Sequence, residues 1–197
     1  MRRPKIQLDL RPYFQNEANG HQRKSMIVLH ETVSHDRPGT GDLAGVAKFL
    51  DDEGLEIHGI IDAEANSAWC YDRRAIYDHT RSGECNVNSK SVGFEQVSDI
   101  PMLPTNALRK DAWDPRGPRR KQLLKVAEWC AWLHKSEGVP LVYSKGREPG
   151  ITSHWSVSRT CLDGDGHWDC HPVHEGGHYP ILYVIRKAQQ MLEGGEL

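Results

Sequence analysis

Short apolar runs alternate with longer stretches of helical spacing, and this alternation constrains the fold more than any other feature of the sequence. The runs are brief and rich in β-forming residues, so they predict buried strands separated by polar loops. Helical spacing predicts helices over 43–52, with Asp42 as the N-cap, and over 119–137 and 179–192. The alternation predicts an α/β fold with a mixed central β-sheet of about five or six strands, packed by two or three helices. The expected strands cover residues 25–30, 57–63, 67–72, 91–97 and 140–144.

The 197 residues suit a single domain, which we place at 25–193 between a polar surface segment at 1–24 and a tail or linker start at 194–197. The net charge of −2 gives no electrostatic reason to expect a nucleic-acid partner. No apolar run approaches the roughly 18–20 residues that span a bilayer, and no apolar segment follows the basic start to make a secretory signal. The five scattered cysteines favour a reducing compartment over a disulfide scaffold.

The stretch ITSHWSVSRTCLDGDGHWDCHP at 151–172 concentrates three histidines, three aspartates and two cysteines. It is either a hydrogen-bonded polar loop or half of a metal site that another segment completes. His154 and the distant His30 both end short apolar runs, so their imidazoles converge if those runs are neighbours in the sheet. A catalytic zinc takes three protein ligands and keeps a fourth position open for water. The candidates for the third ligand are Cys161, Asp163, Asp165, Asp169, Cys170 and His171.

Three other interpretations of these residues stay open at this point. A calcium loop over 163–174 fits poorly, because Trp168 occupies the position of the turn glycine and His174 that of the bidentate glutamate. A structural zinc knuckle would use cysteines and histidines at non-standard spacings. His30 itself could be a hydrogen-bonded strand residue without a ligand.

Four short motifs occur in an order that resembles a known family. They are HET at 30–32, SVGFE at 91–95, SHWSVS at 153–158 and HWDCHP at 167–172. Together they are similar to the signatures of the zinc-dependent N-acetylmuramoyl-L-alanine amidases, a family that includes many phage endolysins and the peptidoglycan recognition proteins. The resemblance spans about residues 25–192 and implies a zinc amidase with that family's fold.

The resemblance also implies roles for individual residues. His30, His154 and Asp169 match the zinc ligands. Cys170 stands where the family has a proline after the ligand, and it stays a rival because some relatives use cysteine at the aspartate position. Glu95 matches a proposed general base. The matches for transition-state stabilisation and substrate binding are His167 and His79. Trp155 and Trp168 lie near the proposed site and could stack on sugar or peptide. For both His79 and His58 the residues themselves favour a structural role, as a polar cleft wall or as an outer hydrogen-bond partner. Ile57, just before His58, stands where some members carry a catalytic tyrosine.

These residue types suit amide hydrolysis. Zinc lowers the pKa of bound water to about 7 and polarises a carbonyl, while a carboxylate such as Glu95 can move the proton. The family's substrate is the bond between N-acetylmuramic acid and L-alanine in bacterial peptidoglycan. We therefore expect a monomeric lysin that waits in the host cytoplasm and acts on the cell wall after release. The competing hypotheses are a non-catalytic peptidoglycan-binding module and, less favoured by the charge, a zinc-dependent nuclease.

Overall fold

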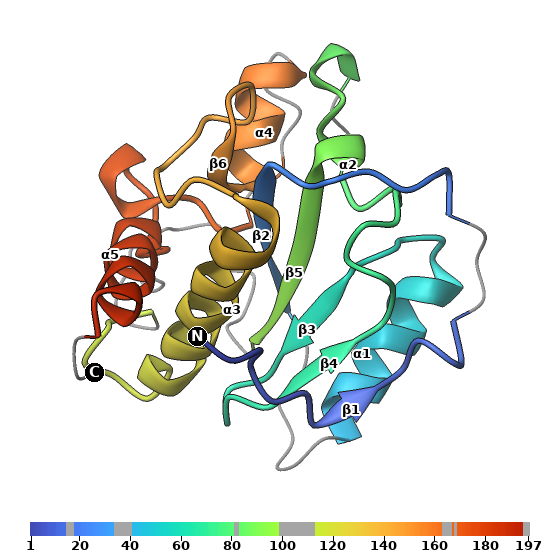
Figure 1. The fold of residues 1–197 in the computed structure, drawn as a ribbon, viewed down its shortest axis with the longest axis horizontal. Coiled ribbons are helices and arrows are strands. Elements are labelled where there is room, and N and C mark those ends of the chain that lie inside the picture. Colours follow the sequence, from blue (N-terminus) through green and yellow to red (C-terminus); the bar gives the residue numbers. More distant parts are fainter. Residues whose placement is uncertain are drawn as a thin grey trace.

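The computed structural model describes residues 1–14, 18–33, 41–80, 83–98, 113–162, 167 and 169–194. Its centre is a six-stranded sheet in the order β1-β4-β3-β5-β2-β6 (Figure 1). Neighbouring strands are parallel except for the antiparallel pair of β3 and β4, so the predicted mixed sheet is confirmed. The strands are β1 (Leu8–Asp9), β2 (Met26–Val33), β3 (Gly59–Ile61), β4 (Ser67–Trp69), β5 (Ser91–Ser98) and β6 (Gly150–Ser153).

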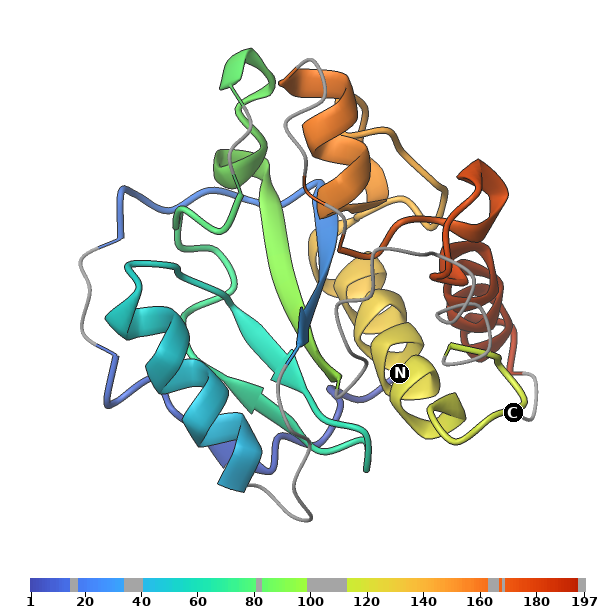
Figure 2. The ribbon, with the colours of Figure 1, turned by 180° about the vertical axis from the view of Figure 1, so that it is seen from behind.

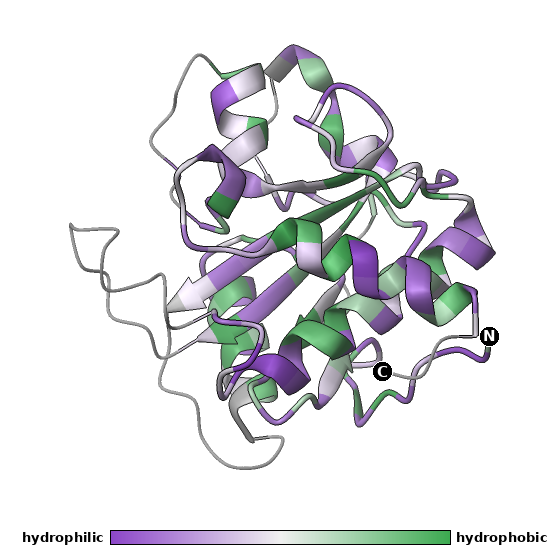
Figure 3. Cartoon of the chain, turned by 90° about the vertical axis from the view of Figure 1, so that its left-hand side faces the viewer, coloured by the Kyte–Doolittle hydropathy of each residue, from purple (hydrophilic) through white to green (hydrophobic). Residues whose placement is uncertain are grey.

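Helices cover both faces of this sheet (Figures 1 and 2). The long helices α3 and α5 pack on one face, against the strand residues Ile27, Leu29 and Phe94. Helix α1 packs on the other face, against Ile60 and Val97. Strands and helices alike carry hydrophobic and hydrophilic segments (Figure 3). The helices are α1 (Gly41–Asp52), α2 (Val87–Lys90), α3 (Arg120–Glu137), α4 (His154–Cys161) and α5 (Ile181–Leu192), and none in the described part of the chain could cross a membrane.

The alternation of side chains along β2 decides which face carries His30. Ile27 and Leu29 point to the face under α3 and α5, whereas Met26 and Val28 pack with Val157 of α4 on the opposite face. His30 follows the alternation of Met26 and Val28, because successive side chains of a strand point to opposite faces. It therefore lies on the face that α4 approaches. The strand does not end at His30 as predicted but continues to Val33.

The last strand differs from the prediction. Residues 140–144 were expected to form a strand, but their pairing in the described structure is a single bridge between Tyr143 and Ile151. The chain turns at once, because the Ser144 hydroxyl accepts a hydrogen bond from the Gly146 N–H at 3.1 Å and donates one to the Glu148 carbonyl at 2.5 Å. Strand β6, at Gly150–Ser153, pairs instead with β2.

The polar stretch after β6 contains a helix where mostly loop was expected. Helix α4 begins at His154, and the Ser153 side chain caps it by accepting a hydrogen bond from the Ser156 N–H at 3.2 Å. Serine is a favoured N-cap, so the SHWS motif carried this signal. The two-residue strand β1 in the N-terminal segment was also not predicted, because two residues are too short for a periodic pattern.

A disulfide joins Cys85 to Cys161, which corrects the expectation of a chain without disulfides. Cys85 ends a 3₁₀ turn at Gly83–Cys85, and Cys161 is the last residue of α4, the helix that begins with His154. The two cysteines are 76 positions apart, so nothing in their local spacing marks them as a pair. The bridge anchors the far end of α4 to the segment before α2, while Cys70, Cys130 and Cys170 are free thiols.

We expect the double substitution Cys85→Ser and Cys161→Ser to lower the free energy of unfolding by about 2–4 kcal/mol, because the bridge restricts the unfolded chain. Urea unfolding of oxidised wild type, reduced wild type and the double variant measures this. The reduced protein should behave like the variant. Equal stability of all three would show that the bridge contributes nothing.

A buried hydrogen bond between a carboxylate and an imidazole ties the C-terminal segment to β2 on the α5 face. The Glu31 carboxylate lies 2.7 Å from Nε2 of His178, and both side chains are at most 1% exposed. The indole N–H of Trp113 donates to the same carboxylate at 3.0 Å, and the Ser98 hydroxyl at 3.2 Å. Because a buried carboxylate needs such partners, this cluster links the segment before α5 and the segment before α3 to the sheet.

Candidate metal centre

Two neighbouring strands bring His30 and His154 together. Strands β2 and β6 are parallel, with Leu29 opposite Ser153, so the residue after each partner lies at the same level. The rings of His30 and His154 are 4.7 Å apart between centroids. The convergence predicted from the two apolar runs is thus present in the structure.

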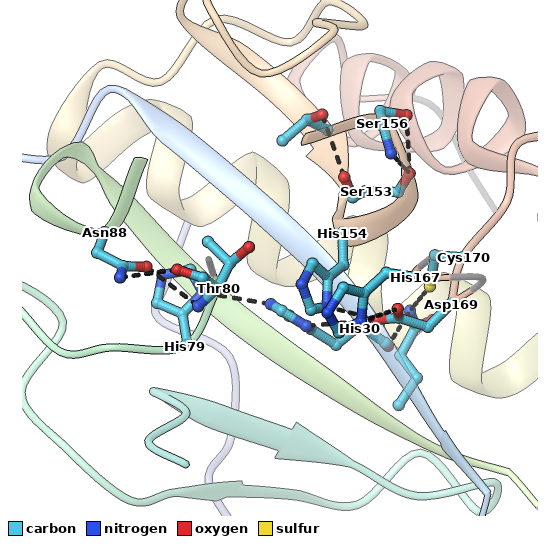
Figure 4. A network of polar contacts seen from close by, with 12 residues as sticks. His30, His79, Thr80, Asn88, Ser153, His154, Ser156, His167, Asp169 and Cys170 are labelled. Carbon is cyan, nitrogen blue, oxygen red and sulfur yellow. Dashed lines mark hydrogen bonds and ion pairs between the residues drawn. The ribbon is translucent and has the colours of Figure 1, made fainter. Parts of the chain in front are cut away.

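Asp169 completes the group from the segment after α4 (Figure 4). Its Oδ2 lies 3.1 Å from Nδ1 of His154 and 3.5 Å from Nδ1 of His30. One possible ligand atom from each of the three residues lies within 4.8 Å of the others. All three residues are less than 9% exposed. The backbone N–H of Trp155 donates to the Asp169 carbonyl at 3.2 Å, which fixes this segment to the start of α4.

The charges of the group suit a divalent cation. Burial lowers the pKa of His30 to about 4, so its imidazole is neutral at pH 7 and keeps a lone pair. Burial alone would raise the pKa of the Asp169 carboxyl, but the electrostatic attraction of His154 and the hydrogen bonds from His154 and His30 outweigh burial and lower it. In addition, Nε2 of His154 is buried without a hydrogen-bond partner among the described residues. Two imidazoles and a carboxylate are a common donor set for catalytic zinc, so the side chains of His30, His154 and Asp169 fit a zinc ion.

Cys170, the rival for the third position, points elsewhere. Its backbone has a left-handed φ of 54°, and its Sγ lies 3.4 Å from the Gln96 Nε2 that donates to it. Burial raises the pKa of the Cys170 thiol well above its ordinary value, which disfavours the thiolate that a metal would need. The structure therefore groups Asp169, and not Cys170, with the two histidines.

Glu95 lies beside this group on β5. It is the register partner of His30 across the parallel pair of β5 and β2, and it is 7% exposed. Burial raises the pKa of the Glu95 carboxyl well above its ordinary value of 4.5, and the nearby carboxylates of Asp169 and Glu31 raise it further. A carboxyl with a raised pKa next to a candidate metal site is the expected form of a general base.

His167 and Trp155 lie around the group. The His167 ring stacks on His154 at 3.9 Å between centroids, and its Nδ1 is 3.8 Å from Oδ1 of Asp169. Its side chain is 40% exposed, so it can meet a substrate. The partly exposed Trp155 ring stacks on His171 at 3.9 Å. Trp168, also predicted to bind substrate, lies outside the described residues, as do Asp163 and Asp165.

His79 is placed behind His30. Its Nδ1 is 3.2 Å from Nε2 of His30, and its Nε2 is 2.8 Å from Oγ of Ser91. Both ring nitrogens are thus engaged inside the protein, and the residue is 6% exposed, so the predicted role in substrate binding finds no free nitrogen. His58 is structural, as expected. It donates from Nε2 to the Ala75 carbonyl at 3.0 Å.

Sequence reasoning missed three residues that support the group. Ser91 contacts His79, and Gly93 donates its N–H to Nδ1 of His58 at 3.1 Å. Gln96 donates from Nε2 to the His30 carbonyl at 3.1 Å and to the Cys170 thiol. Ser91 and Gly93 stand inside the SVGFE motif, which therefore marked the right segment without showing what these residues contact.

Known structures share this fold. The Staphylococcus aureus hydrolase AmiA in complex with its ligand is similar with a TM-score of 0.65 and 19% identity, over 98% of this chain and 87% of that chain. The N-acetylmuramoyl-L-alanine amidase LysC from Clostridium intestinale has a TM-score of 0.58 and 12% identity, over 98% of this chain and 99% of that chain. The endolysin of bacteriophage Ph2119 from Thermus scotoductus has a TM-score of 0.55 and 15% identity, over 92% of this chain and 97% of that chain.

The sequence supplies a further comparison. No curated protein matches the chain significantly. The sequence profile of the N-acetylmuramoyl-L-alanine amidases, however, matches residues 20–172. That range holds all four motifs and the group of His30, His154 and Asp169. The chain therefore belongs to the N-acetylmuramoyl-L-alanine amidase family.

Proposed function

We propose that this amidase uses a zinc ion held by His30, His154 and Asp169 to hydrolyse the bond between N-acetylmuramic acid and L-alanine in bacterial peptidoglycan. The observation that carries the zinc assignment is the convergence of these three buried side chains within 4.8 Å. When bound, zinc supplies Lewis-acid polarisation of the scissile carbonyl and acidifies a coordinated water.

The surrounding residues supply the proton transfers. Glu95 takes a proton from the attacking water and delivers it to the nitrogen of L-alanine as the C–N bond breaks. Its raised pKa suits both halves of that transfer. His167 is exposed on one side of the group and donates a hydrogen bond to the developing oxyanion. Loss of one such donor typically costs about 2.7–4 kcal/mol of transition-state stabilisation.

We propose that aromatic side chains bind the peptidoglycan substrate. Trp155 is partly exposed beside the group, and Trp168 stands one residue before Asp169 in the sequence, so both are proposed to stack on sugar or peptide. We further propose that the chain acts as a monomeric phage endolysin that reaches the wall from the host cytoplasm. The fold shared with the Ph2119 endolysin supports this assignment.

Removal of metal tests the proposal. We expect the purified protein to carry about one zinc per chain, and we expect EDTA to abolish release of stem peptides from peptidoglycan. The measurement is the appearance of free L-alanine amino groups. Re-addition of zinc after removal of EDTA should restore it.

The competing function is a peptidoglycan-binding module without catalysis. It predicts that the protein sediments with purified cell walls but releases no amino groups, with or without zinc. Release of amino groups by a protein shown to be free of metal would contradict the zinc assignment instead. The two results separate the two functions.

A further inference from the structure

A chain of hydrogen bonds leads from the backbone of α2 through Ser91 and His79 to His30. Figure 4 shows its last link, between His79 and His30. The Ser91 hydroxyl donates to the Val87 carbonyl at 2.7 Å. A hydroxyl has one proton, so Ser91 Oγ can only accept from Nε2 of His79, which lies 2.8 Å away. His79 therefore carries its proton on Nε2, and its Nδ1 is an acceptor.

The same reasoning extends to His30. Nδ1 of His79 lies 3.2 Å from Nε2 of His30 and can only accept there. Nε2 of His30 must then be the donor, which leaves the lone pair of His30 on Nδ1. That atom is the one that faces Asp169, at 3.5 Å from Oδ2. A metal ion needs this lone pair, so the tautomer of His30 matters for binding.

The fold holds His79 firmly in this position. The Asn88 side chain accepts from the Thr80 N–H at 3.1 Å and donates to the Thr80 carbonyl at 2.9 Å, which fixes the neighbouring backbone. On the other side Gly93 leaves room for the ring, because a Cβ there would lie 2.8 Å from Nδ1 of His79. This close approach explains why the SVGFE motif has a glycine at position 93.

We propose that His79 and Ser91 are positioning residues that hold His30 in the tautomer protonated on Nε2, so that its Nδ1 lone pair faces the metal site. This inference rests on the zinc site of the proposed function. According to it, the buried residues His79 and Ser91 fix the tautomer of the metal ligand His30. Zinc affinity then depends on the Nδ1 acceptor of His79.

Two variants of His79 separate this acceptor from the rest of the ring. An asparagine places its side-chain oxygen near the position of Nδ1, so His79→Asn keeps an acceptor for His30. A glutamine reaches instead toward the position of Nε2, so His79→Gln keeps a contact with Ser91 but offers His30 no acceptor. We expect His79→Asn to keep zinc affinity within a few-fold and His79→Gln to lose about 10–100-fold, measured by competition with a chelating dye.

Nitrogen-15 NMR of the metal-free proteins reads the tautomer directly. In wild type and His79→Asn, we expect His30 to be protonated on Nε2, and in His79→Gln a mixture of both tautomers. If His30 is protonated on Nδ1 in metal-free wild type, or if both variants bind zinc alike, the inference is overturned. A wild type that shows the expected tautomer but binds no zinc would instead refute the zinc site and leave the hydrogen-bond chain in place.

Two crowded glycines provide a matched control. Gly93→Ala removes the space for His79, so zinc affinity should fall as in His79→Gln. Gly59→Ala is equally crowded, because its Cβ would lie 2.7 Å from Cε1 of Phe94, but it lies in the apolar core. Gly59→Ala should lower stability and keep wild-type zinc affinity. Equal loss of affinity in both variants would show that general disruption, and not His79, is responsible.

Discussion

Replacing Asp169 with alanine is expected to remove bound zinc and amidase activity together. The carboxylate is the only anionic member of the three-residue group, and it lies within 3.5 Å of both imidazoles. Without it, two imidazoles and no anionic ligand remain in a buried site, which binds a divalent cation poorly. The loss should exceed the roughly 10–100-fold that removal of an outer partner costs. Zinc content and release of L-alanine amino groups measure both effects.

Cys170→Ser is the matched control for this prediction. The thiol accepts from Gln96 and points away from the group, so a hydroxyl in its place should keep zinc and activity. Any change should appear as a modest loss of stability. The opposite pattern, with metal lost in Cys170→Ser and kept in Asp169→Ala, would move the third ligand by one residue.

Glu95→Gln should lower kcat by about 10²–10⁴ and leave zinc binding unchanged, because it removes a proton-transfer group and not a ligand. The glutamine keeps the size of the side chain, so substrate binding should change little. Zinc content and kcat measured on the same preparation decide this. A variant that keeps most of its turnover would assign the proton transfer to another group, such as His167.

The same substitution should change the pH dependence of stability. The pKa of Glu95 is raised by burial, so the folded metal-free protein retains a proton that the unfolded chain releases above pH 4.5. Wild type should therefore lose stability relative to Glu95→Gln as the pH rises from 4.5 toward the folded pKa. Urea unfolding of both metal-free proteins at pH 4 and pH 7 measures the difference. The same stability difference at pH 4 and pH 7 would show that the pKa of Glu95 is not raised in the folded protein.

The long periodic elements were predictable from the sequence because their patterns repeat. Helix α3 buries Leu123, Val126 and Cys130 at the expected spacing, and the apolar runs before His30 and around Glu95 became β2 and β5. The two-residue strand β1 and the short helix α4 were harder to predict. The eight residues of α4 contain too few turns for a clear period, and its signal was the cap at Ser153.

The site divides in the same way. Residue types and motif order led to His30, His154, Asp169 and Glu95, because metal and proton chemistry restrict which side chains can serve. The supporting contacts depend on where side chains meet in space. Neither the Ser91–His79–His30 hydrogen bonds nor the disulfide follows from any spacing. The choice between Asp169 and Cys170 depends on which of the two side chains faces the histidines.

The buried contact between Glu31 and His178 bears on how far the chain can be trimmed for expression. The family profile stops at residue 172, before His178, Tyr179 and α5. A protein shortened to that boundary would leave Glu31 without its imidazole and Gln96 without the Tyr179 hydroxyl that donates to it. It would also uncover the surface of α3 that α5 packs against. The smallest autonomous amidase domain should therefore run through Leu192, about twenty residues beyond the profile.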